Sequence, residues 1–538
     1  MQRGSVYSAR AFEAGTAPDF EPPVFLPSAQ ALLCEGGDQR IARNRLTGLN
    51  AYGCAPRPDP DLVAFGSSTA STISTHGLEA AEGLRRRLLQ ALHGASPAAV
   101  YDREASRLRA ELIRHSGLAG VNGLEAVIAA SGTDLHMLIS QLIACGAEGR
   151  ALVVMGEASD TGSGVPAAVA GRHFGACAPF AATTQRGAPI AGALVDVQHV
   201  PARDAEGRLR ETATVDAEVE ALVAGAIDEG RRVMLIITDV SKTGLISPSP
   251  ACALALSRRF PEALDVLVDG CQLRLSAATL NAYAERGWMI AVTGSKFLAG
   301  PAFSGALFIP KAIAERLRGR IVSPRLAAFS ARGDWPEGWA IRARLDPREN
   351  FGLLLRWEAA LEELRRLRRI PEPEVERFLA DFTAAAEAAI AKTPTLEALP
   401  RRTLDRGPGV PDGWDQTASI LPFVMKGGGG SKPMLRLTPG ETARVYELLR
   451  RDLAGALGGS GEPALRIAAA MRVEVGQPVA CGMHDGAPVS ALRLCASARL
   501  IVEACTDGGR RDEILSEVGV ALTKAAWLAG EVSAGRLC

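Results

Sequence analysis

The sequence predicts a doubly wound α/β domain followed by a smaller α+β domain, and two patterns support that fold class. From about residue 125, short and uniformly apolar segments rich in β-branched residues alternate with helical patterns. This alternation is typical of a mostly parallel sheet covered by helices on both faces. After residue 340 the pattern becomes mostly helical. We therefore expect an N-terminal arm at 1–75, a large α/β domain at 76–340 and a small C-terminal domain at 341–538.

The individual elements follow from the length and spacing of the apolar runs. In the α/β domain we expect helices at 77–93, 101–115, 133–145, 164–174, 216–230 and 250–260, and strands at 126–130, 151–155, 233–237, 264–268, 288–292 and 304–309. Because too few residues separate the last two strands for a helical crossover, these strands are predicted to be antiparallel neighbours. In the C-terminal domain we expect helices at 350–369, 372–392, 440–456 and 511–529, and strands at 419–424, 465–474 and 490–495.

Composition narrows the class of protein. The 538 residues include 60 Lys and Arg and 60 Asp and Glu, so no net charge attracts nucleic acid or an anionic membrane. No uncharged apolar stretch of about 18 residues occurs, and no apolar run follows the N-terminus, so neither a membrane span nor a signal peptide is predicted. The ten cysteines lack metal-ligand spacing and indicate free thiols in a reducing cytoplasm. We expect a cytoplasmic protein that has no metal site and binds neither nucleic acid nor membrane.

Polar side chains follow several of the predicted strands. Ser-Gly-Thr-Asp at 131–134 follows the first strand and opens a helix, where it is either a phosphate cradle or a plain N-cap. Asp-Gly-Cys-Gln at 269–272 follows the fourth predicted strand, and Lys296 follows the fifth. Lys296 is a phosphate contact, a nucleophilic amine or a solvated turn lysine. Because ligands bind at the carboxyl ends of strands in such sheets, these groups are expected at one edge.

One cofactor, pyridoxal 5′-phosphate (PLP), uses a lysine, an acid and a set of phosphate donors together. The motifs resemble those of fold-type I PLP-dependent enzymes, specifically the class V aminotransferase group with its cysteine desulfurases and kynureninases. Asp-Gly-Cys-Gln at 269–272 is similar to that group's Asp-x-x-Gln, and Thr-Gly-Ser-Lys at 293–296 is similar to its Ser-Gly-His-Lys. Gly-Pro at 300–301 and Ser-Gly-Ala-Leu at 304–307 resemble its Gly-Pro…Gly-x-Leu. The resemblance implies PLP as cofactor.

The same resemblance implies a role for each matching residue. Lys296 is the Schiff-base lysine and Asp269 meets the ring nitrogen, so these two are the expected catalytic residues. Gln272 and Ser241 lie near the ring hydroxyl. The expected phosphate contacts are Ser131, Gly132, Thr133, Thr293 and Ser295.

Further residues are expected to bind the substrate or to act across a dimer. Arg493 resembles the family's arginine for the substrate carboxylate, although a structural ion pair is the alternative. Asn50 and Ser68, in an arm segment rich in small polar residues, are expected to line the substrate pocket unless the segment is only a loop. Arg348 is expected to replace a partner threonine at the phosphate. The resemblance thus implies a homodimer with its active site at the subunit interface.

One departure from the family concerns the residue that covers the cofactor ring. The family usually stacks a histidine or another aromatic ring there, but 156–164 contains neither. A small residue or a methyl group is then the expected cover. Glu157, Ser159 and Asp160 are candidates to face the substrate.

The predicted function is an aminotransferase acting on an amino acid or related primary amine. The substrate amine displaces Lys296, which then removes the Cα proton while Asp269 sustains the electron sink. The alternative is a lyase, which catalyses β-elimination, decarboxylation or cysteine desulfurase chemistry. Desulfuration would require Cys481 as a nucleophile on a mobile loop, yet alignment on Gln-Pro at 477–478 puts Val475 at that position. A third alternative is a nucleotide-binding protein, because residues 426–432 resemble a phosphate loop. This segment lacks the Gly-Lys-Ser/Thr ending of such loops, which argues against nucleotide binding.

Overall fold

The computed structural model describes residues 25–537 apart from 68, 146–150, 191–194, 429–433, 461, 485 and 507. Its larger sheet has seven strands in the order β2-β8-β7-β6-β5-β3-β4. They are β2 (Glu125–Ala129), β3 (Ala151–Met155), β4 (Val195–His199), β5 (Val233–Thr238), β6 (Leu264–Asp269), β7 (Met289–Thr293) and β8 (Gly305–Ile309). Only β8 runs antiparallel to its neighbours β2 and β7. The prediction of an antiparallel pair at this point is confirmed.

Helices cover both faces of this sheet, as the alternation of strands and helices predicts. Side chains of β5 alternate between two apolar clusters, with Leu235 and Ile237 in one and Met234 and Ile236 in the other. The first cluster includes side chains of α3 (Pro97–His115), α6 (Thr212–Asp228), α7 (Pro250–Arg259) and α8 (Ala277–Glu285). The second includes side chains of α4 (Gly132–Ala144), α5 (Val165–Val169) and α9 (Lys311–Leu317).

A second sheet joins the N-terminal arm to the C-terminal part of the chain. Its order is β1-β12-β13-β10-β11, with β9 also paired to β10. The strands are β1 (Leu62–Phe65), β9 (Leu396–Ala398), β10 (Ile420–Gly427), β11 (Leu435–Arg436), β12 (Arg472–His484) and β13 (Ala487–Cys495). Strand β1 pairs in parallel with β12. The arm therefore contributes an edge strand, which the sequence patterns do not predict.

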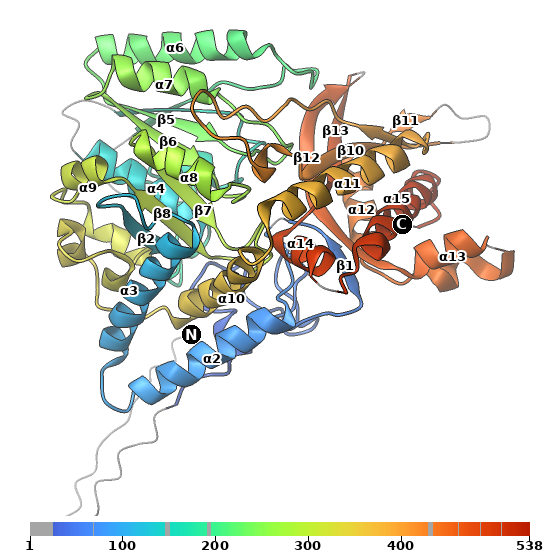
Figure 1. The fold of residues 1–538 in the computed structure, drawn as a ribbon, viewed down its shortest axis with the longest axis horizontal. Helices are drawn as coiled ribbons and strands as arrows, with labels where there is room; N and C mark the ends of the chain where they lie inside the picture. Colours follow the sequence, from blue (N-terminus) through green and yellow to red (C-terminus); the bar gives the residue numbers. More distant parts are fainter. Residues whose placement is uncertain are drawn as a thin grey trace, which may run out of the picture.

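The remaining helices pack mainly around the second sheet and below the larger one (Figure 1). Figure 1 shows the two sheets in separate halves of the molecule, with α2 and α10 side by side. The α-helices are α1 (Ala29–Leu32), α2 (Thr75–Ala91), α10 (Phe351–Leu367), α11 (Glu372–Ala391), α12 (Pro439–Leu449), α13 (Pro463–Ala470), α14 (Ala498–Cys505) and α15 (Arg511–Ser533). Short 3₁₀ turns are η1 (Pro324–Ala328), η2 (Arg332–Asp334), η3 (Ala340–Arg344), η4 (Trp414–Gln416) and η5 (Ala454–Ser460). None of the described helices is long and apolar enough to cross a membrane.

Three predicted elements are wrong in part, one of them the helix predicted at 440–456, because α12 ends at Leu449. The strand predicted at 465–474 is helix α13 over most of its length, because Pro463 occupies the first helical turn and an alanine-rich run follows it. The helix predicted at 164–174 ends at Val169, and Gly171 follows with φ 70°, a conformation that stops helices. Strand β4 and helices α8 and α14 are not predicted. The predicted domain boundaries stay a prediction.

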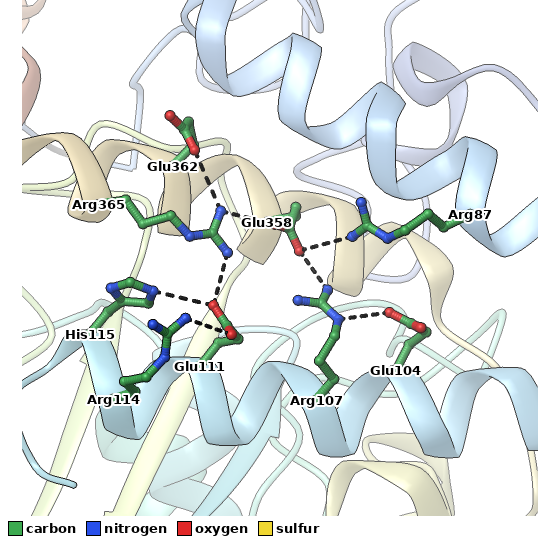
Figure 2. Close-up of polar contacts among 9 residues, drawn as sticks. All are labelled: Arg87, Glu104, Arg107, Glu111, Arg114, His115, Glu358, Glu362 and Arg365. Atoms are coloured by element: carbon green, nitrogen blue, oxygen red, sulfur yellow. Dashed lines mark hydrogen bonds and ion pairs between the residues drawn. The ribbon is translucent and has the colours of Figure 1, made fainter.

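Helices α2, α3 and α10 meet through a layer of charged side chains, which we call the helix ion-pair cluster (Figure 2). Its centre is Glu358 on α10, whose carboxylate lies 2.6 Å from Arg107 on α3, 3.0 Å from Arg365 and 3.7 Å from Arg87 on α2. The other members, drawn in Figure 2, are Glu104, Glu111, Arg114, His115 and Glu362. The cluster fixes α3 and α10 below the larger sheet.

Candidate active site

A cavity of about 310 Å³ lies where β6 and β7 end and α4 begins. This is the edge at which ligands bind in doubly wound sheets. Most of the residues predicted to bind the cofactor line it: Ser131, Gly132, Thr133, Asp269, Thr293, Ser295 and Lys296. The fold therefore brings together groups that are up to 165 positions apart in the sequence, from 131 to 296.

Asp269 ends strand β6 and faces the cavity from a buried position. The Thr161 hydroxyl donates a hydrogen bond to its carboxylate at 2.8 Å, and the Cys271 N–H donates another at 3.2 Å. His136 Nε2 lies 3.6 Å from the same carboxylate. Burial alone would raise the pKa of Asp269, but the charges of His136 and Lys296 and these hydrogen bonds lower it below its ordinary value. The site thus holds an ionised acid in a fixed orientation.

Lys296 lies on the tight turn after β7 and lines the same cavity. Its backbone carbonyl accepts a hydrogen bond from the Ala299 N–H at 2.9 Å, which closes the turn. In the part of the chain that the structure describes, no group lies within hydrogen-bonding or ion-pairing distance of its ammonium group. A half-buried cation without a countercharge close by is costly, so this ammonium group adds little to the stability of the fold.

The N-terminus of α4 forms another wall of the cavity. Ser131 caps the helix by accepting a hydrogen bond from the Asp134 N–H at 3.2 Å. The first N–H groups of the helix have no intrahelical partner, and the helix dipole favours an anion there. A Cβ on Gly132 would lie 2.7 Å from Cys271 Sγ, so a side chain at this position would clash with the cavity wall. This geometry is compatible with both the cradle and the N-cap interpretation.

Three predicted residues are buried behind the cavity and do not line it. Ser241 donates a hydrogen bond to the Asp160 carboxylate at 3.1 Å. Gln272 is buried, and its Oε1 has no hydrogen-bond partner among the described residues. Arg493 is 3% exposed and donates to the Gln477 carbonyl at 2.8 and 3.2 Å. Gln477 itself lines the cavity, so Arg493 lies one residue removed from it.

The other predicted contacts lie elsewhere. Asn50 does not line the cavity, because its side-chain oxygen accepts hydrogen bonds from the Tyr52 and Cys54 N–H groups and closes a turn of the arm. Arg348 is half exposed, lies 3.1 Å from Asp346, and does not line this cavity. Its predicted role requires a second subunit. Ser68 lies outside the described residues.

Several lining residues were missed by the sequence analysis. His136 follows Gly132 by four positions in α4, a spacing that places both on one side of the helix and could have revealed it. Lys242 is the direct neighbour of Ser241. Arg40 and Tyr52 come from the arm, where no periodicity points to them, and burial raises the pKa of Tyr52 to about 12. These residues reach the cavity only through the tertiary fold.

The stretch 156–164, which has no aromatic ring, contributes small side chains to the cavity. Thr161, Gly162 and Ser163 line it, whereas Glu157 and Ser159 do not. Asp160 is partly buried and does not line the cavity, and burial raises the pKa of its carboxyl group despite hydrogen bonds from Thr243 and Ser241. Because Thr161, Gly162 and Ser163 line the cavity, this part of its wall is compatible with the expectation that a small residue covers the cofactor ring.

Cys481 does not lie on a loop beside the cavity. It belongs to strand β12, is 2% exposed and does not line the cavity. Burial raises the pKa of its thiol to about 11. The hypothesis of a mobile-loop nucleophile at this position is therefore wrong. Most of the phosphate-loop likeness at 426–432 lies outside the described residues.

Comparison of the sequence with models of known protein families finds no match, and comparison with curated protein sequences finds none either. Solved structures do match. One is a lysine-to-alanine mutant of C-DES with glycine linked covalently to its PLP cofactor. It has 14% identity and a TM-score of 0.50 over 86% of this chain and 99% of that chain. The cysteine desulfurase CsdA from Escherichia coli has 15% identity and a TM-score of 0.49, covering 86% and 94% of the two chains.

At such low identity the similarity to C-DES establishes the fold and nothing further. The mixed seven-stranded sheet and the coverage of nearly the whole C-DES chain agree with the fold class that the motifs predict. The chain has the fold of the fold-type I PLP-dependent enzymes.

Proposed function

We propose that the protein is a PLP-dependent enzyme acting on an amino acid or a related primary amine. The observation that carries this proposal is one cavity that contains both Lys296, whose ammonium group has no hydrogen-bond or ion-pair partner among the described residues, and a buried ionised acid, Asp269. The N-terminus of α4 adds a site suited to a phosphate at the same cavity. The volume of the cavity, about 310 Å³, falls at the lower end of the usual range for small-molecule sites, about 300–1,000 Å³.

The donor set of the site fits this cofactor. Asp269 is suited to hold a proton on a ring nitrogen, because its pKa is low and its carboxylate is fixed by Thr161 and Cys271. The hydroxyl of Ser295 and the N–H groups at the start of α4 would hold the phosphate. Among the described residues, His136 Nε2, which lines the cavity, is buried without a hydrogen-bond partner and has only the Asp269 carboxylate near it, at 3.6 Å. Such a group is costly unless a ligand satisfies it.

PLP, when bound, supplies an electron sink for the bond that breaks at the substrate's Cα. Lys296 would bind it covalently and, once displaced by the substrate amine, would remove or return the Cα proton. Each of these roles requires Lys296 to be free of structural ion pairs.

Within this class we infer an aminotransferase, with a lyase as the second candidate. The position of Cys481 on a buried strand disfavours desulfuration through that thiol. Cys271 lines the cavity, but burial and the neighbouring Asp269 charge raise its pKa well above the ordinary range, so the thiol stays protonated. β-Elimination and decarboxylation use the same electron sink and stay open. Assays for keto acid, ammonia, sulfide and carbon dioxide from a panel of amino acids distinguish these reactions.

An absorption spectrum of the purified protein with PLP tests the cofactor. We expect a visible band that borohydride removes and that Lys296→Ala abolishes. The matched control is Lys311→Ala, an exposed lysine on α9, which should keep the band. A wild-type protein that shows no visible band with PLP would overturn the proposal.

We further infer a homodimer in which Arg348 of each subunit contacts the phosphate bound by the other. This inference is supported by the resemblance and by the half-exposed position of Arg348, whose partners are Asp346 and the Phe180 carbonyl. Sedimentation measures the oligomeric state. An Arg348→Ala protein that remains dimeric and keeps full PLP affinity would contradict the assigned contact.

A further inference from the structure

A second lysine, Lys242, lines the cavity that contains Lys296 and has no role in the proposal above. It lies on the turn after β5, where its backbone N–H donates to the Asp160 carbonyl at 3.1 Å. Its ammonium group donates to one neutral acceptor, the Ser159 carbonyl, also at 3.1 Å. An ammonium group has three donors, so two stay available for a ligand.

The charges around Lys242 favour an anion. Burial and the cationic neighbours Arg493 and Lys296 lower its pKa to about 8, while Asp160 and Asp269 act in the opposite direction. Within the described ranges no carboxylate lies within 4 Å of its ammonium group. A ligand carboxylate would supply a countercharge that the described residues do not provide within 4 Å.

Arg493, the residue expected to bind the substrate carboxylate, does not line the cavity. Its guanidinium group is buried and donates twice to the Gln477 carbonyl. Gln477 and Lys242 both line the cavity. Lys242 is therefore a cation in direct contact with the cavity, and the charge of Arg493 is close enough to lower its pKa.

We propose that Lys242 binds the α-carboxylate of the substrate and that the enzyme therefore acts on α-amino acids rather than on simple amines. This inference rests on the proposed PLP-dependent function. Arg493 is then a positioning residue that holds Gln477 and adds to the positive potential. A cation paired with the carboxylate stabilises it, whereas loss of carbon dioxide would remove that charge, so the pairing favours proton removal at Cα over decarboxylation.

The test compares ligands that differ only by the carboxylate. PLP-loaded wild type, Lys242→Met and Lys242→Arg are titrated with L-alanine and ethylamine, with L-phenylalanine and 2-phenylethylamine, and with L-lysine and cadaverine. Changes in the visible band report binding without requiring turnover. Lys311→Met, an exposed lysine on α9, is the matched control.

We expect wild type to bind at least one amino acid more tightly than its amine. Lys242→Met should weaken binding of that amino acid about 10–100-fold, the value of a hydrogen bond to a charged group, and leave binding of the amine unchanged. Lys242→Arg should retain most of the preference because it keeps the positive charge. The control should bind both ligands as wild type does.

Three results would overturn the inference, and they are distinguishable. A Lys242→Met protein that weakens both members of every pair equally would show that Lys242 does not recognise the carboxylate. Loss of the PLP band in both Lys242 variants would make this lysine a cofactor ligand instead. Absence of the band in wild type would overturn the proposed function, and the carboxylate assignment with it.

Discussion

The molecule contains two clusters of charged side chains that are built on opposite principles. In the helix ion-pair cluster each described carboxylate contacts at least one arginine, and Glu358 contacts three (Figure 2). In the cavity, Lys296 has no partner among the described residues and Lys242 donates only to a carbonyl. In the first cluster the charges pair with one another, whereas the two lysines of the second have no carboxylate within 4 Å among the described residues.

This difference separates charges that serve folding from charges that serve binding. A buried charge without a countercharge destabilises the folded protein, so a sequence under selection for stability alone would remove it. The ionised Asp269 is stabilised by Thr161, Cys271 and the charges of His136 and Lys296, but Lys296 has no hydrogen-bond or ion-pair partner of its own among the described residues. Substitutions in the two clusters should therefore affect different quantities.

The largest expected effect is on turnover, in the Lys296→Ala protein. We expect turnover to fall by at least about 10⁴-fold because the substitution removes both the covalent attachment and the base. Without cofactor, the free energy of unfolding should change little, since the lost ammonium group has no hydrogen-bond or ion-pair partner among the described residues and attracts Asp269 only at longer range. Urea unfolding of both proteins without PLP measures this. A clearly less stable variant would show that Lys296 has a structural partner after all.

Sequence patterns predict much of the fold because its main signals are local. Apart from β4, the strands from β2 to β8 are each recognisable as an apolar run of about five residues, and the short link after β7 determines the direction of β8. Strand β4 was missed because its sequence, Val-Asp-Val-Gln-His, is only partly apolar and partly exposed at the sheet edge. Strand β1 was missed because its partner β12 lies some 400 residues further along the chain.

The candidate site is predictable where its residues follow strands or open helices. Asp269, Lys296 and 131–133 meet these conditions and line one cavity. Arg40 and Tyr52 could not be predicted, since only tertiary packing of the arm brings them there. The side chain of Arg493 was expected in the cavity, but a motif does not specify whether the guanidinium group faces the ligand or a backbone carbonyl.

Asp269→Asn should give the next largest effect. We expect turnover to fall about 10²–10³-fold, as for the loss of one charge-stabilising group in a preorganised site. The folded pKa of Asp269 lies below its ordinary value, so its ionisation stabilises the fold above about pH 3.9, the unfolded value. This contribution is lost as the pH falls through the lower folded pKa.

The difference in unfolding free energy between wild type and Asp269→Asn is therefore expected at pH 7 and should vanish in acid. Denaturant titrations of the protein without PLP at several pH values measure it. A difference that grows as the pH falls would have the wrong sign and would contradict the assignment of an ionised Asp269.

Glu358→Gln should alter stability without altering the cavity. Glu358 is 6% exposed in its side chain and pairs with Arg107 and Arg365. Removing one member of a buried ion pair costs about 3–5 kcal/mol, and we expect the lower end because both arginines are partly exposed. A shifted urea midpoint with an unchanged slope would measure this loss. The PLP band and turnover should match wild type, and loss of either would connect the two clusters.

The smallest effect is expected at the rim of the helix ion-pair cluster, for Arg114→Gln. Arg114 lies 2.7 Å from Glu111 but is 60% exposed, and such pairs contribute about 0.2–1 kcal/mol. Glu111 keeps His115 and Arg365 as partners after the change. A double-mutant cycle with Glu111→Gln isolates the pair's coupling energy.

Burial would raise the pKa of Glu111, but hydrogen bonds from Arg114 and Arg365 lower it to about 2. The coupling should therefore persist from neutral pH down to about pH 4 and disappear as Glu111 protonates. A coupling well above 1 kcal/mol would mean that the cluster acts as one cooperative network, in which rim and centre are not separable.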